Sequence, residues 1–382
     1  MKGLSLHLPD SLRAQRGVDR ILLLLITVLV LIGSLMVASA GYAYADSRYG
    51  DSLYFARKQF FFGVLGFAVM LLMSYVPIDR IKRAAKPLYF VTVLLLLATL
   101  AFGLTGNGAQ RWIGIGPFTF QPSELAKLSL VLMLALYFDT YEGALSARGH
   151  SRLLTQVVLP LALTGVFCIL VVCQRHLSGL IILAGIGVFV LFLAGAPLKP
   201  LFVLCGGGVG AVGVLAFTLD YARERITVWQ NPAAYPLEGG WQTLQGMMAI
   251  GSGGFFGLGL GNSRLKYSWV SEPANDFIFT ITCEELGFLG AAFILLLFYF
   301  FIRRGYIIGT RTENVFARLV ALGIVSKVAI QVLLNIAVIT NTIPNTGISL
   351  PFFSYGGSSL VMLFAEMGIL LSISRNAKLS YR

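Results

Sequence analysis

Long apolar runs separated by short polar segments dominate the chain. A helix needs about 20 apolar residues to cross the hydrocarbon core of a bilayer, and backbone polar groups must be paired within lipid. Suitable runs fall at 21–44, 59–76, 87–104, 124–141, 153–173, 178–197, 200–219, 276–302, 317–340 and 357–374. The pattern predicts an all-α membrane protein, a polytopic bundle of about ten transmembrane helices.

Composition points to the bilayer as the solvent of this chain. With 57% hydrophobic and 12% charged residues among 382, a water-soluble fold would leave a large apolar surface exposed. The net charge of +12 raises nucleic acid as a partner, but the Lys and Arg residues stand between apolar runs and form no basic face. Membrane lipids are therefore the expected surroundings, and no nucleic-acid partner is expected.

The basic residues predict the orientation of the bundle. If the N-terminus is cytoplasmic, 18 of the 29 Lys and Arg residues fall in cytoplasmic segments, nine fall outside, and Lys127 and Lys327 lie within helices. Cytoplasmic segments of membrane proteins carry such an excess, so both termini are expected in the cytoplasm. No linker or repeat divides the chain, and residues 1–382 are expected to form a single membrane domain.

One long connection, about residues 220–275, is predicted on the extracytoplasmic side, where a loop of this length usually carries function. It contains a glycine series at 251, 253, 254, 257, 259 and 261. No predicted strand precedes these glycines, so a nucleotide-binding loop is excluded by its context. They are expected to allow a re-entrant or tightly folded segment that packs against the bundle.

Asp276 is the leading catalytic candidate, because it ends the long loop where the eighth helix begins. One interpretation is an N-cap of that helix. The other is a general base at the outer membrane face, kept ionised by a helix N-terminus and by Arg264 and Lys266. The two interpretations are compatible.

Ionisable and amide side chains also lie within the predicted helices, where they are costly unless paired or functional. Lys127 follows Glu124 by three residues on one helix face, which predicts either an ion pair or an anion-binding role for Lys127. Glu284 and Glu285 are expected to meet Lys127 or Lys327 in the bundle. The predicted structural polar network comprises Glu124, Glu284, Glu285, Lys327, Gln331 and Asn335.

Residues 345–360 carry Pro351 and the pair Gly356-Gly357, which predict a broken helix beside a polar cavity on the outer side. Interrupted helices of this composition also occur in transporters, so a transport function stays open here. His176 falls in the short outer turn after the fifth helix and is expected to be solvated. Glu366 is a lone carboxylate in the tenth helix.

Four segments in their order along the chain resemble one family, the SEDS proteins of shape, elongation, division and sporulation, the group of FtsW, RodA and the stage V sporulation protein E. They are GAQRWIGIGPFTFQPSELAKL (108–128), GWQTLQGMMAIGSGGFFGLGLGNSRLK (240–266), EPANDFIFTITCEELGFLG (272–290) and NTGISLPFFSYGGSSL (345–360). The resemblance runs over nearly the whole chain and is closer to the division and sporulation branch.

The resemblance implies a peptidoglycan glycosyltransferase of the bacterial cytoplasmic membrane that polymerises lipid II and works with a class B penicillin-binding protein. It also implies that Asp276 is catalytic. Arg111, Glu124, Lys127, Glu285 and Ser358 fall in the family's motifs. Two departures stand out: Arg175-His176 replaces the family's Pro-Asp pair, and Glu366 is not expected from the family.

This chemistry suits the residues. One carboxylate base takes the proton of an attacking sugar hydroxyl, and no carboxylic acid is needed for a diphosphate leaving group that cations stabilise. The candidate substrate- and diphosphate-binding residues are Arg111, Lys127, Arg223, Arg225, Arg264, Lys266 and Ser358. A divalent cation, Mg²⁺ or Mn²⁺, is a further candidate, although no carboxylate cage in the sequence fixes one.

Two other classes of function remain as alternatives: a lipid II flippase or other transporter, and a non-catalytic membrane scaffold of the cell-wall machinery. A flippase needs polar groups through the full depth of the bilayer, whereas the polar residues here gather toward the outer face. A scaffold has no need of an Asp at a loop-to-helix junction. The position of Asp276 therefore favours the enzyme.

Overall fold

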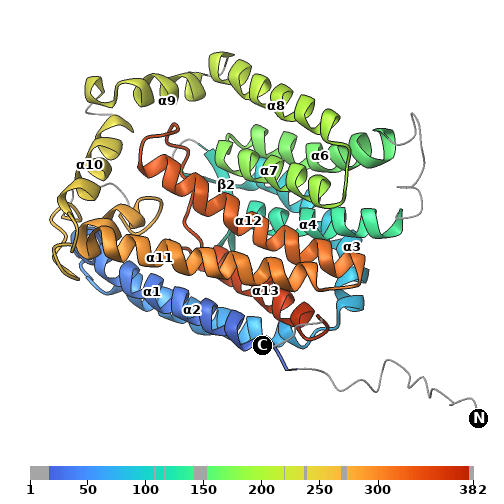
Figure 1. Ribbon diagram of the computed structural model, residues 1–382. Coiled ribbons are helices and arrows are strands. Elements are labelled where there is room, and N and C mark those ends of the chain that lie inside the picture. The colour runs from blue at the N-terminus through green and yellow to red at the C-terminus, as the bar shows by residue number, and fades with distance from the viewer. Residues whose placement is uncertain are drawn as a thin grey trace, which may run out of the picture.

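The computed structural model describes residues 17–106, 109–115, 118–141, 153–218, 220–235, 239–267 and 273–377. In this part of the chain a helix forms at each of the ten positions that hydropathy predicts (Figure 1). The helices are α1 (Arg20–Tyr49), α2 (Tyr54–Ser74), α3 (Ile78–Phe102), α4 (Pro122–Thr140), α6 (Leu159–Cys173), α7 (Leu177–Leu193), α8 (Leu198–Thr218), α11 (Ile278–Thr310), α12 (Val315–Ile339) and α13 (Gly357–Ser374). The predicted helical membrane bundle is confirmed.

Seven segments of the described chain are long and apolar enough to cross a membrane: α1, α2, α3, α11, α12, α13, and α6 together with the π-helical turn η3 (Leu154–Val158) that precedes it. Helix α7 and the segment Leu198–Gly208 of α8 are apolar but shorter. Helix α4 carries Glu124, Lys127 and Asp139 within its 19 residues. These three ionisable residues of α4 show that polar side chains enter the bundle.

The two C-terminal helices form the centre of the bundle. The membrane-spanning windows of α12 and α13 are 61% and 67% buried, whereas those of the other five segments are between 22% and 33% buried. Close packing through glycine helps to bring α2 against α13, because a Cβ on Gly66 would lie 2.2 Å from the ring of Phe364. The segment that precedes α13 is thereby held beside the core.

One end of the bundle is tied together around Asp19. Its carboxylate caps α1 by accepting from Leu22 N at 2.7 Å and pairs with Arg304 of α11 at 2.5 Å. Its main-chain nitrogen donates to Ser374 Oγ at 3.1 Å. The start of α1 and the last turns of α11 and α13 therefore share this end, and the long connection before α11 lies at the other.

A small antiparallel sheet follows α3 and was not predicted. It has the order β1 (Leu104–Gly106), β2 (Ala109–Ile115) and β3 (Phe118–Phe120). The register pairs Leu104 with Trp112 and Gly114 with Thr119. Strands of three to seven residues are too short for a clear alternation of apolar and polar positions, so hydropathy shows only a connection between helices.

The expected long loop is largely helical where it is described. It contains α9 (Asp220–Gln230), the 3₁₀ turn η4 (Pro232–Ala234) and α10 (Gly239–Ser252). In Figure 1, α9 and α10 follow α8 around the edge of the bundle and lead back to α11. The hydropathy pattern did not predict these helices, because they are too short to span a membrane and α9 is mostly polar.

The glycine series after α10 forms the tightly folded segment that was predicted, and it docks on a break in α11. Gly287 interrupts that helix with φ 67° and ψ −170°, a conformation that glycine adopts without a Cβ clash. Leu258 N donates to the main-chain oxygen of Glu284 at 3.0 Å, and Gly259 N donates to the main-chain oxygen of Glu285 at 2.9 Å. The break therefore frees helix carbonyls that the glycine turn satisfies.

Candidate active site

Asp276 lies in the turn before α11, at the end of the bundle opposite Asp19, and is half-buried. Helix α11 begins at Ile278 and its N-cap position is Phe277, so the interpretation of Asp276 as the N-cap is wrong by one residue. The carboxylate faces Gly347, because a Cβ built there would lie 3.0 Å from Asp276 Oδ2. Gly347 has φ +71°, which also favours glycine. Asp276 therefore sits against the segment that precedes α13.

That segment, residues 345–356, is non-helical as predicted. Its main chain is fastened to the turn that carries Asp276: Tyr355 N donates to Ala274 O at 2.8 Å, and Ser354 Oγ donates to Asn275 O at 2.9 Å. From α12, Asn335 Nδ2 donates to Asp276 O at 3.0 Å and to Ile348 O at 2.7 Å. Four hydrogen bonds thus position the backbone on both sides of the carboxylate.

A polar cavity of about 30 Å³ lies beneath this segment, as the sequence predicted for its outer-side break. Glu124, Lys327, Gln331 and three serines of residues 349–359 are among its walls. Its volume exceeds the ~15 Å³ that one water needs on the same measure. Ser358 stands in the first turn of α13, and its buried hydroxyl has no hydrogen-bond partner among the described residues. Water can therefore hydrate the polar groups below Asp276.

A larger cavity of about 530 Å³ lies on one side of the Asp276 turn, and we call it the Arg57–Lys58 cavity. Its walls are Arg57, Lys58, Phe61, Phe62, Trp112, Thr119, Asn275, Tyr355, Gly356 and Gly357. It combines two cations, several aromatic rings and a direct neighbour of Asp276. Neither Arg57 nor Lys58 was predicted as a site residue, although both stand at the start of an apolar helix, at the same end of the bundle as Asp276.

A third cavity, of about 190 Å³, lies between α9, α10 and the segment before α13, and we call it the Trp229 cavity. Its walls are Glu224, Arg225, Val228, Trp229, Gln242, Thr243 and Asn345. Arg225 donates from its guanidinium to Asn345 O, and Gly347 N donates to Asn345 Oδ1 at 3.1 Å. The predicted site residue Arg225 is thereby connected to the residue that faces the Asp276 carboxylate.

The other predicted cations are spread over this end of the molecule. Arg111 of β2 is half-buried and donates to Arg175 O at 2.7 Å. Arg223 on α9 and Arg264 after the glycine turn are exposed, so both are accessible to a ligand. The structure brings none of these three into the walls of either cavity.

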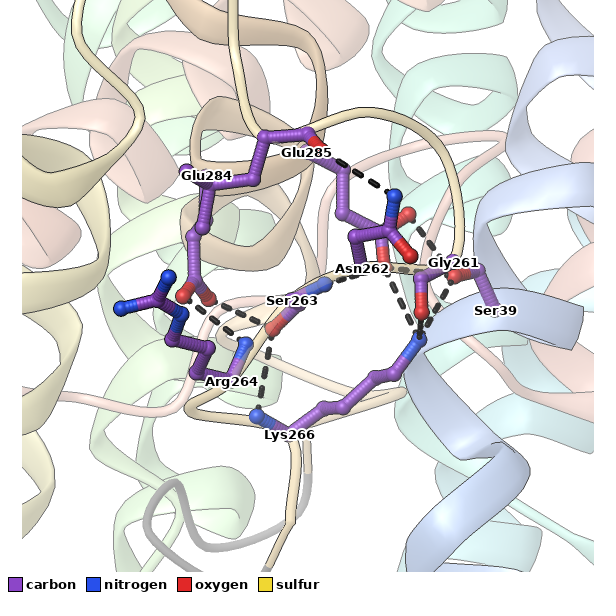
Figure 2. A network of polar contacts seen from close by, with 9 residues as sticks. Ser39, Gly261, Asn262, Ser263, Arg264, Lys266, Glu284 and Glu285 are labelled. Atoms are coloured by element: carbon purple, nitrogen blue, oxygen red, sulfur yellow. Dashed lines mark hydrogen bonds and ion pairs between the residues drawn. The ribbon is translucent and has the colours of Figure 1, made fainter.

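Lys266 was predicted to bind diphosphate, but it lies in a buried network (Figure 2). Its ammonium pairs with Glu285 Oε1 at 3.0 Å and donates to Gly261 O at 2.7 Å and to Ser39 Oγ at 3.3 Å. Lys266 is 2% exposed and Glu285 is fully buried. Since the contacts with Glu285 and Ser39 tie the glycine turn to α11 and α1 and the contact with Gly261 lies within the turn, the structure assigns Lys266 to the scaffold beside the site.

The expected pairing of Glu284 and Glu285 with Lys127 or Lys327 is therefore wrong. Glu285 has Lys266 as its cation, and Glu284 accepts from Ser263 Oγ at 2.5 Å and from the main-chain nitrogen of Arg264 at 3.0 Å. The docked glycine turn brings these donors to the glutamates. Both residues remain in the predicted polar network, with different partners.

Two ion pairs occupy the centre of the bundle. Lys127 pairs with Glu124 at 2.7 Å across one turn of α4, which is one of the two roles predicted for it. Lys327 of α12 pairs with Glu366 of α13, which gives the unexplained carboxylate a partner. Gln331 and Asn335 continue the polar stripe of α12 and are buried. The intramembrane charges thus neutralise one another.

His176, expected in a solvated turn, is only 8% exposed. It occupies the position before α7. Burial, together with the positive charges of Arg111 and Lys127, lowers the pKa of His176 to about 3. The imidazole is therefore neutral at physiological pH, and it packs closely on Gly179.

The described residues contain no group of three or more His, Cys, Asp or Glu side chains that could hold a metal ion. Magnesium commonly binds through one or two carboxylates together with substrate phosphates and water. Asp276 is accessible for such a mode, but the described side chains do not by themselves make a cation cage.

The geometry at this end supports one kind of chemistry. The backbone of Asp276 is held near two cavities. Its neighbour Asn275 lines the one with cations and aromatic rings, and Asn345, which accepts from Gly347 N, lines the one with amide, hydroxyl and indole groups. Such an arrangement can take a proton from a hydroxyl while an anionic group is bound nearby.

Comparison with known proteins adds the following. Residues 19–379 match the family of cell cycle proteins that comprises FtsW, RodA and SpoVE. The chain is 39% identical over 365 residues to stage V sporulation protein E of Bacillus subtilis, covering 94% of this chain and 97% of that protein. It is 38% identical over 384 residues to a probable peptidoglycan glycosyltransferase FtsW of Thioalkalivibrio, covering 98% and 95%.

Solved structures agree with these relatives. A chain of a peptidoglycan synthase complex superposes with a TM-score of 0.79 at 29% identity, covering 94% of this chain and 98% of that one. Thermus thermophilus RodA, a rod shape determining protein, superposes with a TM-score of 0.70 at 28% identity, covering 97% and 100%.

Proposed function

Because the chain belongs to the FtsW, RodA and SpoVE family of cell cycle proteins, we propose that it joins lipid II units into glycan strands with Asp276 as the general base. The chain is a peptidoglycan glycosyltransferase and a multi-pass protein of the cytoplasmic membrane. The observation that carries the proposed site is the partly exposed Asp276, whose neighbour Asn275 lines the Arg57–Lys58 cavity and whose facing residue Gly347 is hydrogen-bonded to Asn345 in the wall of the Trp229 cavity.

The proposed orientation puts both chain ends in the cytoplasm and Asp276 outside. It is supported by the 18-to-9 division of basic residues and by the Asp19–Arg304 end of the bundle, which lies opposite Asp276. The terminal segments 1–16 and 378–382, with five of those basic residues, lie outside the described residues. With this orientation, a lipid-linked substrate reaches the site from the outer leaflet.

In the proposed reaction, a sugar hydroxyl of one substrate attacks the anomeric carbon of the other. Asp276 takes the hydroxyl proton, the new glycosidic bond forms, and the bond from the anomeric carbon to the diphosphate oxygen breaks. The lipid diphosphate leaves with the bonding electron pair as an anion. It therefore needs cations rather than a carboxylic acid.

The Arg57–Lys58 cavity suits that leaving group. Its two cations can bind a diphosphate, and its rings of Phe61 and Phe62 offer an apolar wall for the first part of a lipid tail. Both rings belong to α2, whose outer surface is largely apolar. A Mg²⁺ or Mn²⁺ ion that arrives with the diphosphate would add charge stabilisation there.

We further propose that a class B penicillin-binding protein is the partner. The support is the likeness to a chain of a peptidoglycan synthase complex whose structure concerns coordinated polymerization and crosslinking. The chain described here supplies the polymerising site, and the partner would supply the crosslinking one.

The test is polymerisation of fluorescent lipid II by the purified chain with its penicillin-binding partner in liposomes. Glycan strands resolved on a gel are the expected product. Translocation of lipid II across the bilayer without any polymer would contradict the proposal and favour a flippase, and neither activity would favour a scaffold.

A further inference from the structure

The Trp229 cavity is a second compartment beside Asp276 that the proposed reaction has not used. Its walls come from three separate elements: α9, α10 and the segment before α13. At about 190 Å³ it is smaller than the ~300 Å³ at which pockets for drug-sized ligands begin. The space therefore suits one ring of a ligand and excludes a whole lipid-linked substrate.

The walls of this cavity are tied to one another. Trp229 Nε1 donates to Asn341 O at 2.9 Å, and Asn341 Nδ2 donates back to Trp229 O at 3.5 Å. Across the cavity, Asn345 Nδ2 donates to Gln242 Oε1 at 3.3 Å. The indole is thereby held in place by its edge, and a ligand meets a surface that needs little ordering on binding.

The chemistry of the walls matches a neutral sugar better than an anion. An indole presents an apolar face with a polar edge, and Gln242, Thr243 and Asn345 add amide and hydroxyl groups that both donate and accept hydrogen bonds. Glu224 and Arg225 place opposite charges in the same wall. The Arg57–Lys58 cavity differs, because its walls contain two cations, and the carboxylate that pairs with one of them, Asp51 with Arg57 at 2.5 Å, is not among the lining residues.

The cavity is connected to the catalytic carboxylate by a short path. Asn345 Oδ1 in its wall accepts from Gly347 N at 3.1 Å, and Gly347 faces Asp276 Oδ2. We propose that the Trp229 cavity is a saccharide subsite that holds one N-acetylated sugar ring, next to the ring that reacts at Asp276. The proposal rests on the glycosyltransferase function proposed above and assigns the sugar and the diphosphate to two different cavities near Asp276.

The test measures binding without turnover. The full-length Asp276→Asn protein in detergent is titrated with the soluble disaccharide of N-acetylglucosamine and N-acetylmuramic acid, followed by saturation-transfer NMR. Binding by this protein is expected to weaken about tenfold with Trp229→Ala, because the sugar ring loses the apolar indole face on which it packs. Trp229→Phe is expected to retain most of it.

Phe256→Ala is the matched control, because Phe256 is an aromatic residue of the same connection that is 79% exposed and does not line the cavity. It is expected to bind like the parent. Gln242→Ala, which removes a polar wall group, is a second variant in case Trp229→Ala unfolds, and it is also expected to weaken binding.

The proposal is overturned if the parent does not bind the disaccharide. It is also overturned if Trp229→Ala and Gln242→Ala, shown to be folded by their thermal unfolding curves, bind the disaccharide as tightly as the parent does. Failure of the glycosyltransferase proposal gives a different result, in which the disaccharide binds at Trp229 but the wild-type chain forms no polymer with its partner.

Discussion

The side-chain amide of Asn335 donates to the main-chain oxygen of Asp276 at 3.0 Å and so positions the residue that carries the carboxylate. The same amide donates to Ile348 O at 2.7 Å. A fully buried residue of α12 therefore holds together the two segments between which Asp276 lies, without being one of the groups that contact the substrate in the proposed reaction.

Asn335→Leu should lower kcat by about 10- to 100-fold with little change in KM, because a displacement on the order of 1 Å can cost that much in rate. The variant keeps a side chain of similar size and removes the donor. Initial rates of lipid II polymerisation at several substrate concentrations measure this. Ser326→Ala on the same helix, which loses only a bond to its own helix carbonyl Leu322 O, should behave as wild type. An unchanged kcat in Asn335→Leu would show that the bridge does not position Asp276.

Lys266→Met should strongly destabilise the protein, because it leaves Glu285 buried without its cation. Removal of one partner of a buried pair typically costs about 3–5 kcal/mol. The double variant Lys266→Met with Glu285→Gln should recover most of that stability and part of the activity. Thermal unfolding and polymerisation are measured on Lys266→Met, Glu285→Gln, the double variant and wild type.

The same cycle decides between two roles of Lys266. If Lys266 binds the diphosphate, as the sequence suggested, the double variant will be folded but inactive. Recovery of activity together with stability will show that the pair serves the glycine turn and the break in α11.

Stability should fall with acidification through His176. Its pKa is lowered by burial, and by Arg111 and Lys127, to about 3 in the folded state, against about 6.5 in the unfolded chain. The unfolded state therefore binds a proton below pH 6.5 that the folded state does not. The contribution of neutral His176 to the free energy of unfolding is present above pH 6.5 and is lost as the pH falls toward 3, at roughly 1.4 kcal/mol per pH unit.

His176→Gln should lose less stability than wild type between pH 7 and pH 5 in thermal unfolding experiments. Equal losses would mean that His176 is protonated in the folded protein.

Arg57→Gln with Lys58→Gln should raise the KM for lipid II by about tenfold and leave kcat closer to wild type. These residues contribute the cations of the cavity proposed for the diphosphate, and each charge-assisted contact is worth on the order of 1.5–3 kcal/mol before screening by solvent. Polymerisation rates are measured at two ionic strengths, and the rise in KM of the double variant should resemble the rise that added salt causes in wild type.

Arg48→Gln, which removes an exposed cation near the same end, is the control. A KM that Arg48→Gln raises as much would indicate a general effect of surface charge.

Hydropathy was sufficient for the ten helices, because an apolar run of this length has few alternatives in lipid. The break at Gly287 was not predictable in the same way. A single glycine within an apolar run looks like a tolerated helix residue, and only the docking of Gly257 and its neighbours against it makes the interruption stable.

The candidate site was predicted at Asp276 because its carboxylate stands at a loop-to-helix junction, which is a local signal. The partners of Lys266 and Glu366 depend on how distant segments meet. Lys266 joins a residue of α1 and one of α11, and Glu366 joins Lys327 of the neighbouring helix. No spacing along the chain specifies such pairs. Arg57 and Lys58 were overlooked for the same reason, since the strand residues Trp112 and Thr119 complete their cavity.

The most direct test of the account is polymerisation of labelled lipid II by the Asp276→Asn chain with its class B penicillin-binding partner in liposomes. Asn preserves the size of the side chain and the main-chain oxygen that accepts from Asn335, but it cannot take a proton. We expect expression, partner binding and thermal unfolding to match wild type while glycan strands fall below detection. Glycan strands formed at the wild-type rate would contradict the assignment of Asp276 as the base.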